Sequence, residues 1–394
     1  MKTMPAPVGG SAHTILIYLP QLKVGGAEIS MLRLAQGLRD RGQQVCIVVH
    51  TLDPVAQTLA GDIEIVGLDA GRTLAALRRL IALLRQRRPD ALISALTHTN
   101  IVAALATRVA RVATRLIVTE HAPISSMQSI DPSWSYRITR ALMPAAYRLA
   151  HAIVAVSQGV YDDLAPMLGR RTRKKLSVIF NPVLRHDWQM RAQAPVDDPW
   201  FQVGAAPVIL SVGRLGREKN FGLLIRAFAR LRVRATSARL AIIGEGAERT
   251  ALQALIIELG LEGRVQLLGQ RDNPYAYMRR ANVFVLPSLF EGFGNVLVEA
   301  MACGTAVIST DCPVGPREIL CDGEFGTLVP SDDRTALTQA IDDVLDRAAP
   351  SARARTRALR ARARALEFTV ERSVDDYLAL FVHANAAPME RSGK

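Results

Sequence analysis

Two glutamates, Glu291 and Glu299, flank a glycine-rich stretch in the segment FEGFGNVLVEAMACG. An apolar run ending at Ser288 precedes it and a helical pattern follows, which predicts a strand, a glycine turn and a helix N-terminus. Backbone N–H groups at such a turn bind anions, and carboxylates accept hydrogen bonds from sugar hydroxyls. We therefore expect a sugar nucleotide here, with one of its ends at Glu291, its phosphates at the glycines and its ribose at Glu299. The alternative is that both glutamates are ordinary solvated residues.

Two cations follow another predicted strand, in the segment SVGRLGREKNFGLLIRAFARL. Arg214 and Lys219 lie between this strand and an amphipathic helix, where a guanidinium fork and a point charge can together hold a diphosphate. Ordinary surface charge is the alternative. Gly244 ends a further strand in LAIIGEGAE, where a glycine pattern alone is as typical of a plain turn as of a ligand site.

Three further candidates lie in the first half of the chain. Gly25 and Gly26 follow the apolar run TILIYLP and open a helical pattern, so a ligand can approach the backbone there. His121 comes directly after the predicted strand in VTEHA. A lone histidine in such a place is more often structural than catalytic.

Short β-rich runs alternate with stretches of helical length in both halves of the 394-residue chain, which predicts βαβ units and parallel sheets. The polar, proline-containing segment 181–206 interrupts the alternation, and we interpret it as a linker. We therefore expect two doubly wound, Rossmann-like α/β domains, residues 1–190 and 191–368, facing each other across a cleft with ligands at the carboxyl ends of their strands. The Ala/Arg-rich segment 351–368 is expected to be a solvated helix.

The formal net charge of +13 is concentrated in the first half of the chain. Residues 1–190 hold 23 Lys and Arg against 12 Asp and Glu, whereas residues 191–394 hold 26 against 24. Such a surface suits an anionic membrane and phosphate-bearing substrates, or is merely solvated. Few aromatic residues lie among the charges and no nucleic-acid motif is present, so we expect no binding to nucleic acid.

A helical pattern near residue 140 combines apolar and basic residues. The apolar members are Trp134, Tyr136, Leu142 and Met143, and the basic members are Arg137, Arg140 and Arg148. No apolar run has the length of a membrane span, and the start of the chain suits a buried strand better than a signal peptide. We therefore expect a cytoplasmic protein that rests peripherally on the inner face of the membrane.

The cysteines show no CxxC pair and no zinc-ligand spacing, so we expect buried apolar residues and no metal site. They are Cys46, Cys303, Cys312 and Cys321.

Taken together, the motifs resemble glycosyltransferase family 4, the retaining, sugar-nucleotide-dependent transferases of GT-B fold. The resemblance covers nearly the whole chain and is carried by GGAE, TEH, AIVAVSQGV, GRLGREKNFGLLIRAF, IIGEGAER and the E-x7-E spacing. It implies that Arg214 and Lys219 bind the donor diphosphate and that Glu299 binds the ribose. The transferred sugar and its phosphate would be bound by Glu291, Gly292, Phe293, Gly294, Asn295 and Val296.

The resemblance also implies that Gly26 approaches the donor and that His121 faces the donor sugar or the acceptor. Residues 369–394 would form a terminal helix, which packs back near the first domain, and a tail. Within the family, VISTDCPVGPREIL is similar to a loop of bacterial enzymes that extend polyprenyl-diphosphate-linked oligosaccharides. Most relatives carry a glycine where this chain has Pro316, so Arg317 and Glu318 are expected to line a somewhat different acceptor or sugar edge.

The expected function is retaining transfer of a hexose or N-acetylhexosamine from a nucleotide sugar to a lipid-linked or other glycan, in cell-surface polysaccharide or lipopolysaccharide biosynthesis. UDP is the expected nucleotide by analogy, and no cofactor is expected beyond this donor. The Asp-x-Asp metal motif of the other large transferase fold is absent, so catalysis is expected to need no metal. The alternatives are a sugar-nucleotide 2-epimerase of the same fold and a transferase acting on a small soluble acceptor.

Overall fold

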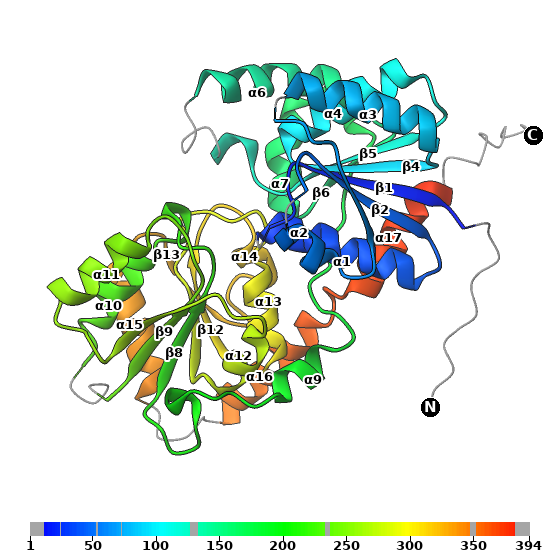
Figure 1. The fold of residues 1–394 in the computed structure, drawn as a ribbon. Coiled ribbons are helices and arrows are strands. Elements are labelled where there is room, and N and C mark those ends of the chain that lie inside the picture. Colours follow the sequence, from blue (N-terminus) through cyan, green and yellow to red (C-terminus); the bar gives the residue numbers. More distant parts are fainter. Residues whose placement is uncertain are drawn as a thin grey trace, which may run out of the picture. The chain divides into compact units, whose positions relative to one another are not determined.

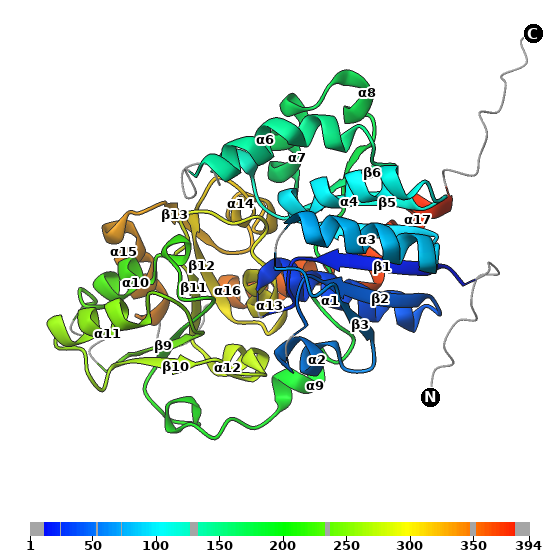
Figure 2. The same ribbon diagram turned by 45° about the horizontal axis from the view of Figure 1, so that its top comes forward.

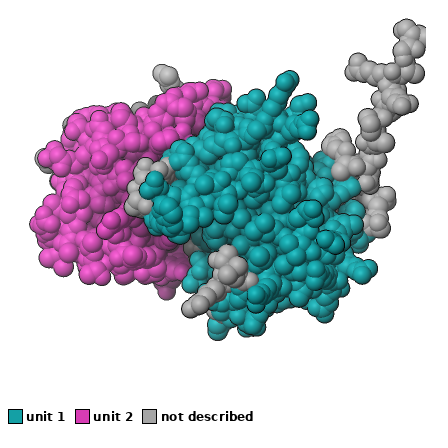
Figure 3. Space-filling model, turned by 90° about the horizontal axis from the view of Figure 1, so that it is seen from above, with its two compact units in different colours: residues 1–182, 370–394 teal, residues 183–369 magenta. Residues whose placement is uncertain are grey.

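The computed structural model of the chain describes residues 12–23, 25–52, 54–71, 73–126, 133–232, 237–346 and 352–382. The chain forms two compact units (Figure 3), unit 1 with residues 1–182 and 370–394, and unit 2 with residues 183–369. The expected boundary at residue 190 instead falls inside helix α9 (Trp188–Gln193), which packs on α12 (Pro274–Arg280) within unit 2. The segment reads as a linker because it is polar overall, but its apolar residues Trp188 and Ala192 are buried.

Unit 1 is built on a seven-stranded parallel sheet with the order β3-β2-β1-β4-β5-β6-β7. The strands are β1 (Thr14–Leu19), β2 (Gln44–Val49), β3 (Glu64–Gly67), β4 (Ala91–Ala95), β5 (Arg115–Glu120), β6 (Ala152–Ala155) and β7 (Leu176–Val178). Its central strands are apolar almost throughout, because helices cover both faces of a doubly wound sheet. The strand order reverses between β1 and β4, which is where such sheets bind ligands.

The helices of unit 1 form one layer on each face of this sheet (Figures 1 and 2). One layer contains α1 (Gly26–Asp40), α2 (Pro54–Ala60) and α17 (Val370–Val382), and the other contains α3 (Thr73–Arg87), α4 (Thr97–Ala110) and α6 (Trp134–Tyr147). The shorter α7 (Gln158–Leu164) and α8 (Arg170–Arg173) precede β7.

Helix α17 joins the core of unit 1 although unit 2 separates it from the rest of that unit in sequence. A Cβ atom at Gly37 of α1 would lie 2.5 Å from Cγ1 of Val370, so the missing side chain lets the two helices approach closely. Tyr377 of α17 is buried in this core, and burying a side chain of this kind contributes roughly 2 kcal/mol. The expected tail, residues 383–394, lies outside the described residues.

Unit 2 is built on a six-stranded parallel sheet with the order β10-β9-β8-β11-β12-β13. The strands are β8 (Val208–Val212), β9 (Arg239–Ile243), β10 (Val265–Gly269), β11 (Val283–Leu286), β12 (Ala306–Asp311) and β13 (Thr327–Pro330). Helices α10 (Phe221–Phe228), α11 (Arg249–Glu258) and α15 (Arg334–Leu345) cover one face. Figure 1 shows α12, α13 (Asn295–Ala302) and α16 (Ala352–Ala365) on the other. The two doubly wound parallel sheets confirm the expected α/β fold class.

Helix α16 corrects the expectation of a solvated helix for segment 351–368. Ala361 and Ala365 are buried, and the helix packs on α13. Arg357 on α16 donates hydrogen bonds to the carbonyl oxygens of Gly323, at 2.8 Å, and Gly326. Composition does not reveal this contact, because alanine serves equally well in a solvated helix and in a closely packed one.

The chain crosses between the units twice, at residues 182–183 and 369–370, and the two crossing segments are hydrogen-bonded to each other. The N–H groups of Val183 and Leu184 both donate to the carbonyl oxygen of Phe368, at 3.1 and 3.0 Å. None of the described helices combines the length and the hydropathy that crossing a bilayer requires.

Candidate active site

The loops after β8 and β11 hold most of the candidate residues, and these two strands adjoin where the strand order of unit 2 reverses. Arg214 and Lys219 follow β8, and Glu291 follows β11. The N–H of Leu289 donates to the carbonyl oxygen of Glu218 at 2.9 Å, which joins the two loops directly. Residues that lie 72 positions apart in sequence are thereby brought to the edge of the sheet where doubly wound folds bind ligands.

Lys219 and Glu291 form an ion pair with 2.5 Å between Nζ and Oε1. The two side chains are only 18% and 10% exposed, respectively. The hydroxyl of Ser288 donates to the same carboxylate oxygen at 2.7 Å, and that of Thr310 donates to the carbonyl of Ser288 at 2.5 Å. The pair therefore fixes the loop after β11 and also places a cation at the ligand-binding edge.

Arg214 lies close to this pair in sequence but is far more accessible, with 67% of its side chain exposed. Its Nη2 is 2.6 Å from Oε1 of Glu218, four residues along the same loop. A guanidinium has five N–H donors, so this contact leaves donors that can bind an anionic ligand. Glu218 offsets part of the positive charge.

Gly244 is a packing position between the loops that follow β8 and β9. Its φ is +147°, and a Cβ atom there would lie 1.9 Å from the carbonyl oxygen of Gly213. The N–H of Leu215 also donates to the carbonyl of Glu245 at 2.9 Å. A side chain at residue 244 would displace the loop that carries Arg214, so glycine is required here by packing, whether or not a ligand also approaches.

The glycine turn after Glu291 leads through Gly292, Phe293 and Gly294 into α13, whose first residues are Asn295 and Val296. Gly294 has φ +107° and caps the helix without a side-chain hydrogen bond. The positive end of the helix dipole therefore lies at the same edge as Lys219. Phe293 is a core residue, because its ring meets that of Phe368 edge-on, with 5.2 Å between centroids.

Glu299 lies in the second turn of α13 and is 5% exposed. The hydroxyl of Tyr275 donates to its Oε1 at 3.3 Å. This tyrosine orients the carboxylate from α12. Sequence reasoning missed it because the partner comes from a different element, 24 residues away.

Arg317 and Glu318 belong to the short helix α14 (Pro316–Ile319). Arg317 forms ion pairs with Asp311 and with Asp322, the latter at 2.9 Å. These two ion pairs connect α14 to the last residue of β12, Asp311, and to Asp322 in the turn that follows α14. Pro316 is buried at the first position of the helix, where proline is well tolerated because that N–H has no helical partner.

His121 lies directly after β5 of unit 1 and is buried. Its Nε2 is 3.0 Å from Oγ1 of Thr119, and its Nδ1 has no hydrogen-bond partner among the described residues. Burial lowers the pKa of His121 to about 4, so the imidazole is neutral near pH 7. A neutral imidazole can orient a ligand by a hydrogen bond, but it cannot supply a positive charge.

Glu120, next to His121, is a buried carboxyl that sequence reasoning did not single out. It accepts hydrogen bonds from Oγ1 of Thr97 at 3.1 Å, from Nδ2 of Asn100 at 3.2 Å and from the hydroxyl of Tyr147. Burial raises the pKa of Glu120 to about 7, and these donors partly oppose the rise. The only sequence signal was its place at the end of an otherwise apolar strand.

The glycine pair of unit 1 lies at the N-terminus of α1, where Gly25 is the N-cap and Gly26 the first helical residue. A Cβ atom at Gly25 would meet the carboxylate of Glu28 at 2.3 Å, whereas one at Gly26 would meet no atom of a described residue within 4 Å. Local packing therefore does not require glycine at residue 26. Gly25, Gly26 and His121 all follow carboxyl ends of strands in unit 1, and the remaining candidate residues lie in unit 2.

Helix α6 presents an apolar stripe that differs in part from the expected one. Trp134, Ile138 and Leu142 are exposed and are spaced four residues apart, so they share one face. The expected surface contacts at Met143 and Tyr136 are wrong. Met143 is fully buried, and Tyr136 is half-buried and donates its hydroxyl to the carbonyl of Ile124 at 2.7 Å.

The basic residues expected beside this stripe are differently exposed. Arg137 and Arg148 are exposed and Arg140 is half-buried. The guanidinium of Arg137 lies 5.9 Å from the centroid of the Trp134 ring. The exposed side of α6 thus combines apolar and basic groups.

Comparisons with known proteins match both units. The family model described as Glycosyltransferase Family 4 matches residues 24–184, and the model described as Glycosyl transferases group 1 matches residues 198–362. A Campylobacter jejuni enzyme, N-acetylgalactosamine-N,N'-diacetylbacillosaminyl-diphospho-undecaprenol 4-alpha-N-acetylgalactosaminyltransferase, is 37% identical over 62% of this chain. The match spans 65% of that enzyme's length, slightly less than two thirds.

A second Campylobacter jejuni relative is an alpha-1,4-N-acetyl-D-galactosaminyltransferase whose name gives a diNAcBac-PP-undecaprenol-linked glycan as its acceptor. It is 27% identical over 84% of this chain and 89% of its own length. Among solved structures, Anabaena HepE in complex with UDP-glucose has a TM-score of 0.77 at 23% identity, over 93% of this chain and 99% of that protein. At this identity the likeness concerns the fold.

Proposed function

We propose, from the premise that this chain belongs to glycosyltransferase family 4, that it transfers a sugar from a nucleoside diphosphate sugar to a glycan acceptor. One observation carries the proposal. A cation held by a carboxylate, Lys219 with Glu291, lies at the reversal point of the unit 2 sheet beside the accessible Arg214 and the N-terminus of α13. This combination suits a ligand that has both phosphates and hydroxyl groups.

The donor would be bound by unit 2. Arg214 and Lys219 would contact the diphosphate of the donor. The nucleoside diphosphate is the leaving group and gains negative charge as its bond to the sugar breaks, so fixed cations beside it lower the barrier. The carboxylate of Glu291 would accept hydrogen bonds from the transferred sugar, and that of Glu299 from the ribose. The turn from Gly292 to Val296 would hold the sugar and its phosphate.

The donor is proposed to be a UDP-linked hexose or N-acetylhexosamine. The support is that both Campylobacter relatives are named as N-acetylgalactosaminyltransferases and that HepE was solved with UDP-glucose. No further cofactor is invoked.

The reaction is proposed to retain the anomeric configuration, with the acceptor attacking on the face from which the phosphate departs, and to need no divalent metal. The cations Arg214 and Lys219 would take the place of a metal at the diphosphate. Activity should therefore persist in a chelator. Complete loss of transfer in chelator, restored by magnesium or manganese, would contradict this mechanism.

The acceptor is proposed to be a polyprenyl-diphosphate-linked glycan bound by unit 1 at the cytoplasmic face of the membrane. The support is the undecaprenol diphosphate in the names of both Campylobacter relatives and the exposed Trp134, Ile138 and Leu142 beside Arg137 on α6. Gly26 and His121 would contact the donor sugar or the acceptor. Each basic residue near an anionic surface is worth about 1 kcal/mol and is screened by salt, so attachment would be reversible.

Liposome flotation tests the membrane contact. Binding should require anionic lipid, fall steeply from low to high salt, and weaken when Arg137→Glu and Arg140→Glu are combined. No binding to anionic vesicles even at low salt would favour the alternative, a transferase acting on a small soluble acceptor.

The decisive assay for the function is turnover of a panel of sugar nucleotides with a membrane extract, followed by product analysis. A lipid-linked glycan carrying one added α-linked sugar is the expected product. A free epimer of the sugar, formed without any acceptor, would instead identify a 2-epimerase of the same fold.

A further inference from the structure

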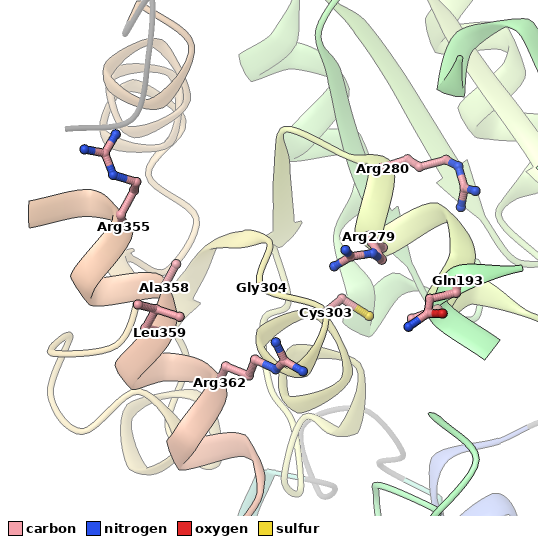
Figure 4. Close-up of a pocket in the computed structure, with 10 residues that line it drawn as sticks. Gln193, Arg279, Arg280, Cys303, Gly304, Arg355, Ala358, Leu359 and Arg362 are labelled. Carbon is pink, nitrogen blue, oxygen red and sulfur yellow. The ribbon is translucent and has the colours of Figure 1, made fainter. Parts of the chain in front are cut away.

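A pocket of about 690 Å³ lies in unit 2, away from the candidate donor site (Figure 4). Arg279 and Arg280 end α12 just before β11, and Cys303 and Gly304 follow α13 just before β12. These residues precede the amino ends of their strands, whereas the donor-site loops follow the carboxyl ends of β8 and β11. The pocket and the candidate donor site therefore lie at opposite edges of the same sheet.

Among the residues that the structure describes, four arginines line the pocket and no aspartate or glutamate does. They are Arg279, Arg280, Arg355 and Arg362. Arg279 and Arg362 are exposed and form no ion pair with an acidic residue in the part of the chain that the structure describes. Figure 4 shows both side chains directed toward the space beside Cys303. The side chains of Arg280 and Arg355 extend away from this space. The like charges of Arg279 and Arg362 repel each other there, and a bound anion would relieve this repulsion.

Helix α16 shows that these arginines are not simply a consequence of an arginine-rich composition. On one side of the helix, Arg360 pairs with Glu324 and Arg364 with Glu367. On the other side, Arg355, Ala358, Leu359 and Arg362 have the spacing of a single helical face and line the pocket. Of these residues, Arg362 turns its guanidinium toward the space beside Cys303.

Arg362 also lies over the ring of Trp188, with 5.4 Å between Cζ and the ring centroid. The Trp188 ring restricts the movement of the Arg362 side chain, while the N–H donors of Arg362 remain at the pocket. Side chains that are already restricted lose less entropy when a ligand binds. Arg362 is therefore the best-positioned donor of the group.

We propose that this pocket binds a ligand with two neighbouring phosphate groups, independently of the sugar-nucleotide donor. A guanidinium binds a phosphate through two parallel N–H bonds, so Arg279 and Arg362, which both turn toward the space beside Cys303, match two neighbouring phosphates. The volume lies within the roughly 300–1,000 Å³ typical of small-molecule pockets. The ligand is either a free diphosphate or a phospholipid headgroup that carries two phosphates, and the proposal stands apart from the proposed transfer reaction.

Calorimetric titration of the full chain with inorganic diphosphate tests the proposal. The variant carrying Arg279→Gln and Arg362→Gln should bind at least about tenfold more weakly, since each charge-assisted hydrogen bond to a phosphate is worth about 1.5–3 kcal/mol. A variant carrying Arg226→Gln and Arg230→Gln, which removes the same charge from exposed positions in unit 2 outside this pocket, should bind like the wild type. The single Arg279→Gln variant, which keeps the Trp188 contact, should show a smaller loss in the same direction.

Arg214→Gln separates the pocket from the donor site. If diphosphate binding is lost in Arg214→Gln and unchanged in Arg279→Gln/Arg362→Gln, the anion binds only at the donor site and the proposal is overturned. Binding equal to wild type in all variants overturns it too. A melting temperature measured without ligand checks that each variant is folded.

Vesicle binding distinguishes the two sources of phosphate. If the ligand is a lipid headgroup, Arg279→Gln/Arg362→Gln should reduce binding to vesicles of phosphatidylcholine and cardiolipin, whose headgroup carries two phosphates, and inorganic diphosphate should compete. If vesicle binding is unaffected while calorimetric binding is lost, the pocket serves a free diphosphate. Either result supports an anion site in the pocket.

Discussion

The ion pair between Lys219 and Glu291 should contribute to the stability of unit 2 as well as to catalysis. At 2.5 Å and an effective dielectric constant of about 20, the attraction is about 7 kcal/mol before desolvation is subtracted. Removing one partner of a buried pair costs about 3–5 kcal/mol, because the other charge is left unpaired. Both side chains here retain some contact with water, so we expect Lys219→Met and Glu291→Gln each to lower the free energy of unfolding by about 2–3 kcal/mol.

Unfolding of unit 2 can be followed by tryptophan fluorescence. Two of the three tryptophans in the chain, Trp188 and Trp200, are buried in unit 2, whereas Trp134 of unit 1 is 72% exposed and should change little. Urea titrations of the two single variants and the double variant complete a double-mutant cycle. The double variant should be little less stable than either single one, which gives a coupling energy of about 2 kcal/mol.

Transfer activity should respond differently from stability. A single variant leaves one buried charge unpaired, and the double variant removes that charge as well. The double variant still lacks both the cation and the carboxylate that are proposed to bind the donor. Activity should stay low in all three variants, at least about a hundredfold below wild type. Single variants as stable as wild type, or stability losses that simply add in the double variant, would refute the structural role of the pair.

Two further predictions concern the buried carboxyl of unit 1 and the packed glycine of unit 2. The pKa of Glu120 is raised to about 7, so the contribution of Glu120 to the stability of unit 1 is lost as pH rises from about 4.5 to 7. The pKa of His121 is lowered to about 4, so the contribution of His121 is lost as pH falls from about 6.5 to 4. These opposite trends should largely cancel in wild type. In Glu120→Gln only the histidine effect remains, so the free energy of unfolding of unit 1 should fall by up to about 3 kcal/mol between pH 6.5 and 4. Hydrogen exchange of unit 1 peptides measures this change, and a stability that does not vary with pH would contradict the assignment. Gly244→Ala should destabilise unit 2 by about 3 kcal/mol or more, because the added Cβ atom would lie 1.9 Å from a carbonyl oxygen. The control variant Gly26→Ala, whose Cβ atom would meet no described residue, should have the melting temperature of wild type. Equal melting temperatures for the two variants would contradict the packing described at Gly244.

The parallel sheets could be predicted because strands buried on both faces are apolar along their whole length, as in the runs of β1 and β8. The edge at which Arg214, Lys219 and Glu291 meet followed from the same pattern, since each lies just after a strand. Spacing could not show that Lys219 pairs with Glu291 across 72 residues. That contact depends on which strands become neighbours.

Burial of individual side chains was predicted less well than the strands. Met143 and Tyr136 were expected on the surface of α6 because a helix in isolation gives no indication of which side meets its neighbours. Trp188 lies in a polar segment, so its burial against unit 2 could not be inferred from composition. Glu120 was missed for a similar reason, since its three hydrogen-bond donors come from two other elements, Thr97 and Asn100 from α4 and Tyr147 from α6.

The closing of unit 1 by α17 has a consequence for synthesis on the ribosome. Residues 1–182 emerge first, but the surface of α1 around Gly37 stays uncovered until Val370 and the rest of α17 appear, after all of unit 2. At about 5–20 residues per second, translating residues 183–369 takes roughly 10–40 s. During that interval the nascent first unit exposes an apolar groove, and a chain truncated before α17 would expose it permanently. The order of translation thus delays completion of the first unit until the second has been made.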